Sequence, residues 1–111
     1  TLLGLAIDVR TRRPILGNIT GGFAGPAIKP VALRMVWQVA KAVNIPVSGL
    51  GGIMTGIDAI EFMMAGADTV QIGTANIIDP NAMERIADEM DEWCDKNGVK
   101  DIQEIVGTLK A

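Results

Sequence analysis

The chain has 111 residues, 49% of them hydrophobic, and carries a net charge of −3 with a pI near 4.8. This length suits one modest domain but falls short of the roughly 250 residues of a closed (β/α)8 barrel. The acidic balance argues against nucleic acid and anionic membrane surfaces as partners, and no apolar run approaches the ~18 residues of a membrane span.

Residue types also limit the chemistry that the chain can perform alone. Neither histidine nor tyrosine occurs, which excludes a self-contained Ser-His or Cys-His catalyst, and no metal site is predicted. The single cysteine, Cys94, cannot form an internal disulfide, which favours a reducing cytoplasm. Because Cys94 falls on an apolar helical stripe with acidic neighbours that raise a thiol pKa, we expect it to be structural.

The first segment, residues 1–8, is a nearly continuous apolar run, which predicts a buried parallel strand. A strand that begins the chain without an earlier partner suggests that the chain is part of a larger protein. Residues 9–20 then predict a hairpin excursion with a polar turn at 10–14. Asp8 is either a site acid or a turn former. The turn carries three arginines that either attract an acidic ligand or are solvated: Arg10, Arg12 and Arg13.

The next segment, residues 21–30, has three glycines in its first five positions, which permits close approach to a flat ligand. Pro26 and Pro30 suit the first turns of a helix. Lys29 is either a phosphate ligand or a solvated first-turn residue. Apolar residues at 3–4 spacing predict an amphipathic helix after this point, and Met35 and Trp37 are expected to pack. The stripe is Ile28, Ala32, Met35, Val36, Val39, Ala40 and Val43.

A short predicted strand from Val47 runs directly into Gly51 and Gly52. Residues 55–58 then read as a capping box that opens a helix, which Gly66 ends. Backbone N–H groups without side chains, placed at a helix N-terminus, form a ready anion site. The alternative is that the glycine pair makes only a tight turn between strand and helix.

A second unit of the same kind follows one helix later. Residues 67–74 predict a strand that ends in Gly73 and Thr74. Two successive strand ends of this kind are typical of the phosphate site that βα barrels build from neighbouring loops. Together they favour the phosphate interpretation, and we predict that the two loops bind one phosphate, that of a cofactor.

The last part is predicted to be helical. Asp79 and Pro80 are expected to cap and start a helix that runs to about Lys96, and Asp101 is expected to cap a final short helix. The order of elements predicts an α/β fold with three parallel strands, that is, three βα units with a hairpin and a final helix. Residues 1–111 would form a single partial βα-barrel domain, with ligands at the carboxyl ends of the strands.

Four segments resemble dihydroorotate dehydrogenases, most closely the C-terminal part of the NAD-linked (class 1B) catalytic subunits. The resemblance covers essentially the whole chain, in order and with matching spacing. The segments are Thr1–Asp8, Asn18–Pro30, Gly49–Ile53 and Gln71–Ala75.

This family is an FMN-containing (β/α)8 barrel that oxidises dihydroorotate to orotate in pyrimidine synthesis, with NAD as the final acceptor for this class. The resemblance implies that five residues line the FMN site and that Thr1 contacts the substrate. Four of the five would hold the FMN phosphate: Gly51, Gly52, Gly73 and Thr74. It also implies a homodimer with an iron-sulfur/FAD electron-transfer subunit. The FMN-lining residues are Gly25, Gly51, Gly52, Gly73 and Thr74.

In the family, a cysteine takes a proton from C5 of dihydroorotate while hydride passes from C6 to flavin N5. That cysteine, the flavin-contacting lysine and a substrate-binding asparagine loop all lie earlier in the barrel, and Cys94 does not match. The chain alone is therefore expected to have no turnover. Within the motifs, Phe23-Ala24 stands where Leu-Ser is usual, and Ser48 and Leu50 where Ile and Met are usual.

Two alternatives remain open. One is a different βα-barrel enzyme that binds a phosphorylated substrate and no flavin. The other is a non-catalytic half barrel that self-associates or binds a partner through open strand edges and apolar faces.

Overall fold

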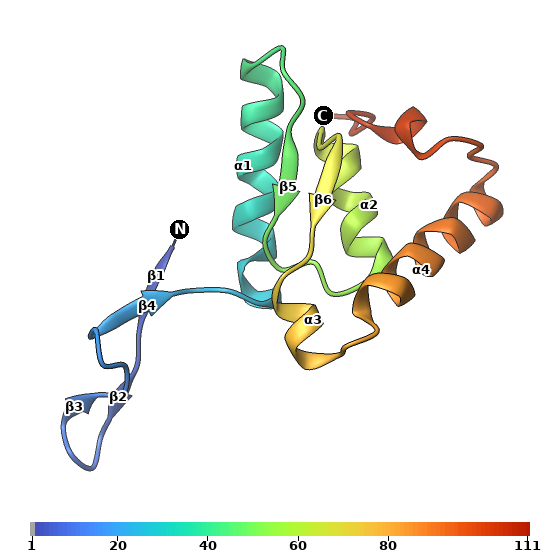
Figure 1. The fold of residues 1–111 in the computed structure, drawn as a ribbon. Coiled ribbons are helices and arrows are strands. Elements are labelled where there is room, and N and C mark those ends of the chain that lie inside the picture. The colour runs from blue at the N-terminus through green and yellow to red at the C-terminus, as the bar shows by residue number, and fades with distance from the viewer. Residues whose placement is uncertain (1) are drawn as a thin grey trace.

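A computed structural model describes residues 2–111 as a mixed α/β fold, drawn in Figure 1. Its strands are β1 (Leu3–Leu5), β2 (Ile7–Asp8), β3 (Arg13–Pro14), β4 (Thr20–Gly22), β5 (Ser48–Leu50) and β6 (Thr69–Gln71). Its α-helices are α1 (Lys29–Ala42), α2 (Gly56–Ala65), α3 (Thr74–Ile78) and α4 (Ala82–Asn97). Two short 3-10 helices, η1 (Pro26–Ile28) and η2 (Ile102–Ile105), complete the chain.

Residues 2–22 form an antiparallel arm, which corrects the prediction of a buried parallel strand. β1 pairs antiparallel with β4, and β2 pairs antiparallel with β3. The side chains of Leu3 and Leu5 are 69% and 57% exposed. The predicted hairpin is present, but its second arm continues past residue 20 to Gly22, the end of β4. Antiparallel strands close over a short turn, whereas a parallel pair needs a crossover that this segment lacks. Figure 1 shows the arm extending away from the helices.

The parallel sheet therefore has two strands, not three. β5 and β6 pair in parallel, with Gly49 opposite Val70, and α2 provides the crossover between them. Gly49 is buried, whereas its neighbours Ser48 and Leu50 are exposed. This alternation places one face of the pair against α1 and α2 and leaves the other face uncovered within residues 2–111.

α1 and α2 begin and end where the sequence predicts. Pro30 lies in the first turn of α1. Thr55 and Asp58 form the capping box of α2, in which the Asp58 N–H donates to Thr55 Oγ1 at 3.2 Å. Gly66 ends α2 with φ of 125°. Only Ala32 and Val36 of the predicted α1 stripe are buried.

The C-terminal helices differ in one respect from the prediction. The strand end at Gly73 leads into α3, a five-residue helix that is not among the elements predicted from the sequence. α4 then begins at Ala82, so Asp79 is not its N-cap. Asp79 instead accepts a hydrogen bond from the Asn81 N–H at 3.0 Å. Asp101 caps the last helix as expected, and that helix is a 3-10 turn.

The core is small and rich in alanine. Phe62 and Ile86 are its largest fully buried side chains. The radius of gyration is 16.5 Å, against about 13 Å for a compact domain of this length. The arm that extends away from the helices accounts for the larger radius. No helix within residues 2–111 has the length and apolar character needed to cross a bilayer.

Candidate functional site

A cavity of about 700 Å³ lies where the arm, α1 and the ends of β5 and β6 meet. All five residues predicted to line a cofactor site line this cavity, and they come from three separate loops. The remaining lining is largely apolar, with Ser48 and Gln71 as polar members, and none of the lining residues within 2–111 is charged. The five predicted residues are Gly25, Gly51, Gly52, Gly73 and Thr74.

The glycine pair after β5 needs to be glycine for steric reasons. Gly51 and Gly52 have φ of 127° and 77°, a region that other residues rarely adopt. A Cβ on Gly52 would lie 2.8 Å from the Lys29 backbone nitrogen and 2.9 Å from the Gly25 carbonyl oxygen. A Cβ on Gly51 would lie 2.7 Å from the Ala32 Cβ. The β5–α2 loop is thus packed directly on the start of α1.

The second predicted loop is open rather than packed. Gly73 is exposed and precedes the first residue of α3, Thr74. A Cβ on Gly73 would meet no atom within 4 Å. Gly73 lines the cavity, so a ligand in the cavity can approach its backbone closely.

Several backbone donors at these loops lack partners. Outside the β5–β6 ladder and within residues 2–111, the N–H groups of Gly52 and Gly73 donate to no protein acceptor. The N–H groups that follow in the β5–α2 loop, those of Met54 and Thr55, are satisfied by Asp58. Unpaired N–H groups beside an uncharged cavity favour an anionic ligand held by backbone donors.

Lys29 lies in the first turn of α1, where its side chain contacts two acids and does not line the cavity. Its Nζ lies 2.6 Å from Asp58 Oδ1 and 2.7 Å from Glu61 Oε2, and its side chain is only 25% exposed. Hydrogen bonds to Asp58 and Glu61 raise the pKa of Lys29. This ion pair ties the start of α1 to the start of α2 and so fixes the glycine loop from outside.

Asp58 is the centre of that contact. Its Oδ2 accepts hydrogen bonds from the N–H groups of Met54 and Thr55 at 2.9 and 3.0 Å. Burial acts to raise the pKa of Asp58, but the hydrogen bonds from Lys29 and Met54 outweigh it, and the pKa is lowered overall. The carboxylate is therefore stabilised as an anion by the fold.

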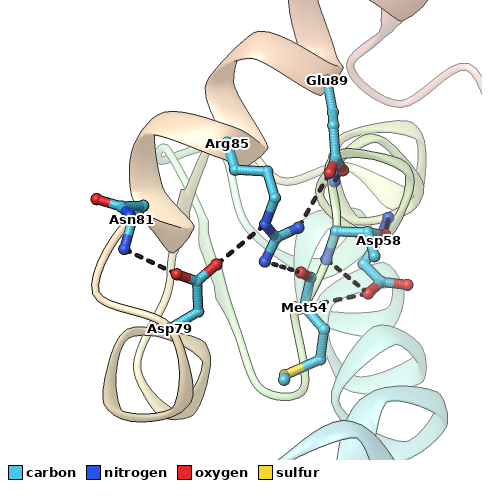
Figure 2. Close-up of polar contacts among 8 residues, drawn as sticks. Met54, Asp58, Asp79, Asn81, Arg85 and Glu89 are labelled. Carbon is cyan, nitrogen blue, oxygen red and sulfur yellow. Dashed lines mark hydrogen bonds and ion pairs between the residues drawn. The ribbon is translucent and has the colours of Figure 1, made fainter.

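A second polar cluster, shown in Figure 2, was not foreseen from the sequence. Arg85 on α4 donates to Asp79, to Glu89 and to the Met54 carbonyl. Glu89 also accepts from the Gly56 N–H at 2.6 Å, and this bond is the main cause of its lowered pKa. The four-residue spacing of Arg85 and Glu89 is a sequence signal for an ion pair on one helix face. Nothing local signals the contact with Met54.

The other candidate residues lie away from the cavity. Asp8 forms the turn, accepting from the Arg10 N–H at 2.9 Å, and the Arg10 side chain is 84% exposed. Cys94 is half-buried on α4. Burial is the main cause that raises the pKa of its thiol, and nearby acidic side chains raise it further, as expected for a structural cysteine. Thr1, the predicted substrate contact, lies outside the described residues. No group of three or more metal-ligating side chains gathers in the part of the chain described.

Replacing Asp58 by asparagine is expected to destabilise the chain by about 1–2 kcal/mol at pH 7, because a charged acceptor of three hydrogen bonds is lost. The folded state lowers the pKa of this carboxyl, so its contribution is full above the unfolded pKa. This contribution is lost as pH falls through the folded pKa, which lies below the unfolded one. In urea unfolding, the difference in unfolding free energy between wild type and Asp58→Asn should be smaller at pH 3 than at pH 7. Asp88→Asn, at an exposed site on α4, is the matched control, and a constant gap would contradict this role.

The known proteins that this chain resembles in sequence share one description. The sequence profile described as dihydroorotate dehydrogenase matches residues 1–93. The chain is 64% identical over 110 residues to the catalytic subunit of dihydroorotate dehydrogenase B (NAD(+)) from Geobacter metallireducens, covering 99% of this chain and 36% of that protein. It is 58% identical over 110 residues to the corresponding subunit of Bacteroides fragilis, again over 36% of its length. The chain thus spans about a third of these curated relatives.

Solved structures agree with this relationship. The fold is similar to that of Eimeria tenella DHODH in complex with ferulenol, with a TM-score of 0.76 and 28% identity. The alignment covers 95% of this chain and 29% of that one. The ligand-free structure of the same enzyme also has a TM-score of 0.76.

Proposed function

This chain belongs to the dihydroorotate dehydrogenase family, and we propose that it is the part of an NAD-linked catalytic subunit that holds the phosphate of FMN. The identity of 64% to such a subunit over 99% of the chain supports the subclass. We further propose that it corresponds to the C-terminal portion of that subunit's (β/α)8 barrel. The whole enzyme would oxidise dihydroorotate to orotate.

The observation that carries the FMN proposal is the convergence of five residues from three loops on one cavity. Its volume of about 700 Å³ is in the range of cofactor pockets. The apolar lining suits a flat ring system, and the unpaired N–H groups of Gly52 and Gly73 suit a phosphate. The residues present therefore fit FMN.

When bound, FMN would supply the hydride acceptor for the oxidation. The residues of this chain would bind and orient it. Gly51, Gly52, Gly73 and Thr74 would hold the phosphate through backbone donors, and Gly25 would allow the chain to pass close to the cofactor. Cys94 does not line the cavity, so the proton-accepting group would come from the rest of the subunit.

The partners of the whole enzyme are also proposals. The relatives are named as catalytic subunits of an NAD(+)-linked enzyme, which supports a further electron-transfer subunit, for which we propose an iron-sulfur/FAD protein. We also propose a homodimeric catalytic subunit. A cytoplasmic location is supported by the single unpaired cysteine.

Replacing Gly73 by valine is expected to weaken FMN binding at least tenfold, or about 1.4 kcal/mol, without unfolding the chain. The new side chain would enter the open space of the cavity, where a Cβ meets no protein atom. Quenching of flavin fluorescence on titration with the purified chain measures the affinity.

The matched control for this experiment is Gly17→Val. A Cβ at Gly17 also meets no atom within 4 Å, but this glycine lies in the arm and does not line the cavity. FMN binding of Gly17→Val should equal that of wild type. A wild-type chain that is folded by circular dichroism, yet shows no saturable quenching, would contradict the proposal that these loops hold FMN.

A further inference from the structure

We infer that Arg85 is a positioning residue that fixes the spacing between the two phosphate-binding loops, a role that rests on the proposed function. Arg85 lies on α4 and does not line the cavity. Figure 2 shows its guanidinium between Asp79 on one side and Met54 and Glu89 on the other. It thus joins the segment that follows the Gly73 loop to the segment that follows the Gly52 loop.

Each of the three guanidinium nitrogens of Arg85 has its own acceptor. Nε donates to Asp79 Oδ2 at 3.2 Å, Nη1 to Glu89 Oε1 at 3.0 Å, and Nη2 to the Met54 carbonyl oxygen at 3.2 Å. The fork of donors is rigid, so the three acceptors must keep a fixed geometry. A lysine has a single nitrogen and cannot occupy these three directions at once.

The Asp79 contact reaches the Gly73 loop through a short element. α3 has five residues, from Thr74 to Ile78, and the Asp79 N–H donates to the Ala75 carbonyl at 2.8 Å. A displacement of Asp79 therefore moves α3, and with it the loop at Gly73 and Thr74.

The other contacts reach the Gly52 loop at two points. Met54, whose carbonyl accepts from Arg85, is two residues beyond Gly52. Glu89, held by Arg85, accepts from the Gly56 N–H at 2.6 Å. The stretch from Gly52 to Gly56 is therefore fastened to α4 at both its middle and its end.

The docking of α4 itself does not depend on Arg85. Ala82 and Ile86 are buried beneath the helix. A Cβ on Gly56 would lie 2.5 Å from Glu89 Cβ and 2.9 Å from the Met90 nitrogen, so the start of α2 touches α4 directly. Arg85 and its acidic partners are about one-third exposed, and such pairs add little to global stability. Losing Arg85 should loosen the loops more than the fold.

Hydrogen exchange of the ligand-free chain tests the inference without any flavin. Arg85→Ala should accelerate exchange at least tenfold at the amides of residues 51–56 and 73–76, and leave α1 and the buried part of α2 within twofold of wild type. Lys96→Ala is the matched control, because Lys96 forms an ion pair with Glu92 on the same helix at 2.8 Å, away from both loops. Unchanged exchange in the two loops, or equal acceleration throughout the chain, would overturn the inference.

The nature of the contact is tested by Arg85→Lys, which retains the charge but not the fork. It should resemble Arg85→Ala within about threefold in loop exchange. Full restoration of slow exchange by lysine would show that charge alone suffices and would overturn the geometric role.

Flavin binding links the inference to the proposed function. Arg85→Ala should raise the FMN dissociation constant about tenfold and leave that of riboflavin, which lacks the phosphate, within twofold of wild type. Equal weakening of both flavins, or of neither, would overturn the inference. Failure of wild type to bind FMN would instead count against the proposed function, and the exchange result would still decide whether Arg85 orders the loops.

Discussion

Replacing Gly52 by alanine is expected to destabilise the chain by about 3 kcal/mol and to abolish measurable FMN binding. The backbone at Gly52 has φ of 77°, and this conformation alone disfavours alanine by about 1–2 kcal/mol. In addition, the new Cβ would lie under 3 Å from the Lys29 nitrogen and the Gly25 oxygen. These are backbone atoms that cannot turn away, so relief requires α1 and the glycine loop to separate, at a further cost of about 1–3 kcal/mol.

Gly98→Ala separates the two causes. Gly98 ends α4 with φ of 68°, but a Cβ there meets no atom within 4 Å. This control should lose only the conformational part, about 1 kcal/mol. Urea unfolding followed by circular dichroism measures both variants against wild type. If Gly52→Ala proved no less stable than Gly98→Ala, the close packing of the loop on the start of α1 would be wrong.

Much of the central fold could be predicted because its signals are local. The capping box at Thr55 and Asp58, the glycine that ends α2, and Pro30 at the start of α1 are each specified within a few residues. The glycine loops were found in the same way, since a strand that ends in small residues before a helix is a local pattern. The structure brings their glycines to one cavity.

The arm could not be predicted correctly because its apolar run fits two pairings. The continuous apolar run of residues 3–8 favours a buried parallel strand, but the pairing that forms also depends on which strands are available. In the structure, β4 is the partner available to β1, and Gly21 pairs with Gly4. Composition alone contains no information on that choice.

The polar contacts behind the site were missed for a different reason. Lys29 and Asp58 are 29 positions apart, and Arg85 and Met54 are 31 apart. Long-range pairs of this kind follow from how α1, α2 and α4 pack, which no sequence window contains. The residues next to Lys29 in the sequence therefore give no sign of its contact with Asp58. The assignment of the anion as FMN came from family resemblance, since the glycine pattern alone indicates only a phosphate.

Replacing Phe62 by alanine is expected to have the largest effect on stability, a loss of about 3–5 kcal/mol. Phe62 is 0% exposed and is one of the two largest fully buried side chains. Natural domains have a total stability of about 5–15 kcal/mol, and this core is small. The melting temperature should therefore fall by more than about 12 °C, and FMN binding should be lost with the fold. Thermal unfolding by circular dichroism measures the change.

Ile77→Ala and Gly49→Ala identify the cause of the Phe62 effect. Ile77 is also a large apolar residue on a helix but is 87% exposed, so its loss should change stability by less than about 0.5 kcal/mol. A Cβ on Gly49 would lie 2.7 Å from Phe62 Cδ1, so Gly49→Ala should be destabilising alone and better tolerated once Phe62 is alanine. A coupling of about 1–2 kcal/mol in this cycle is expected. Strict additivity would mean that Phe62 does not pack on β5, and that the strand leading to Gly51 and Gly52 is supported by some other contact.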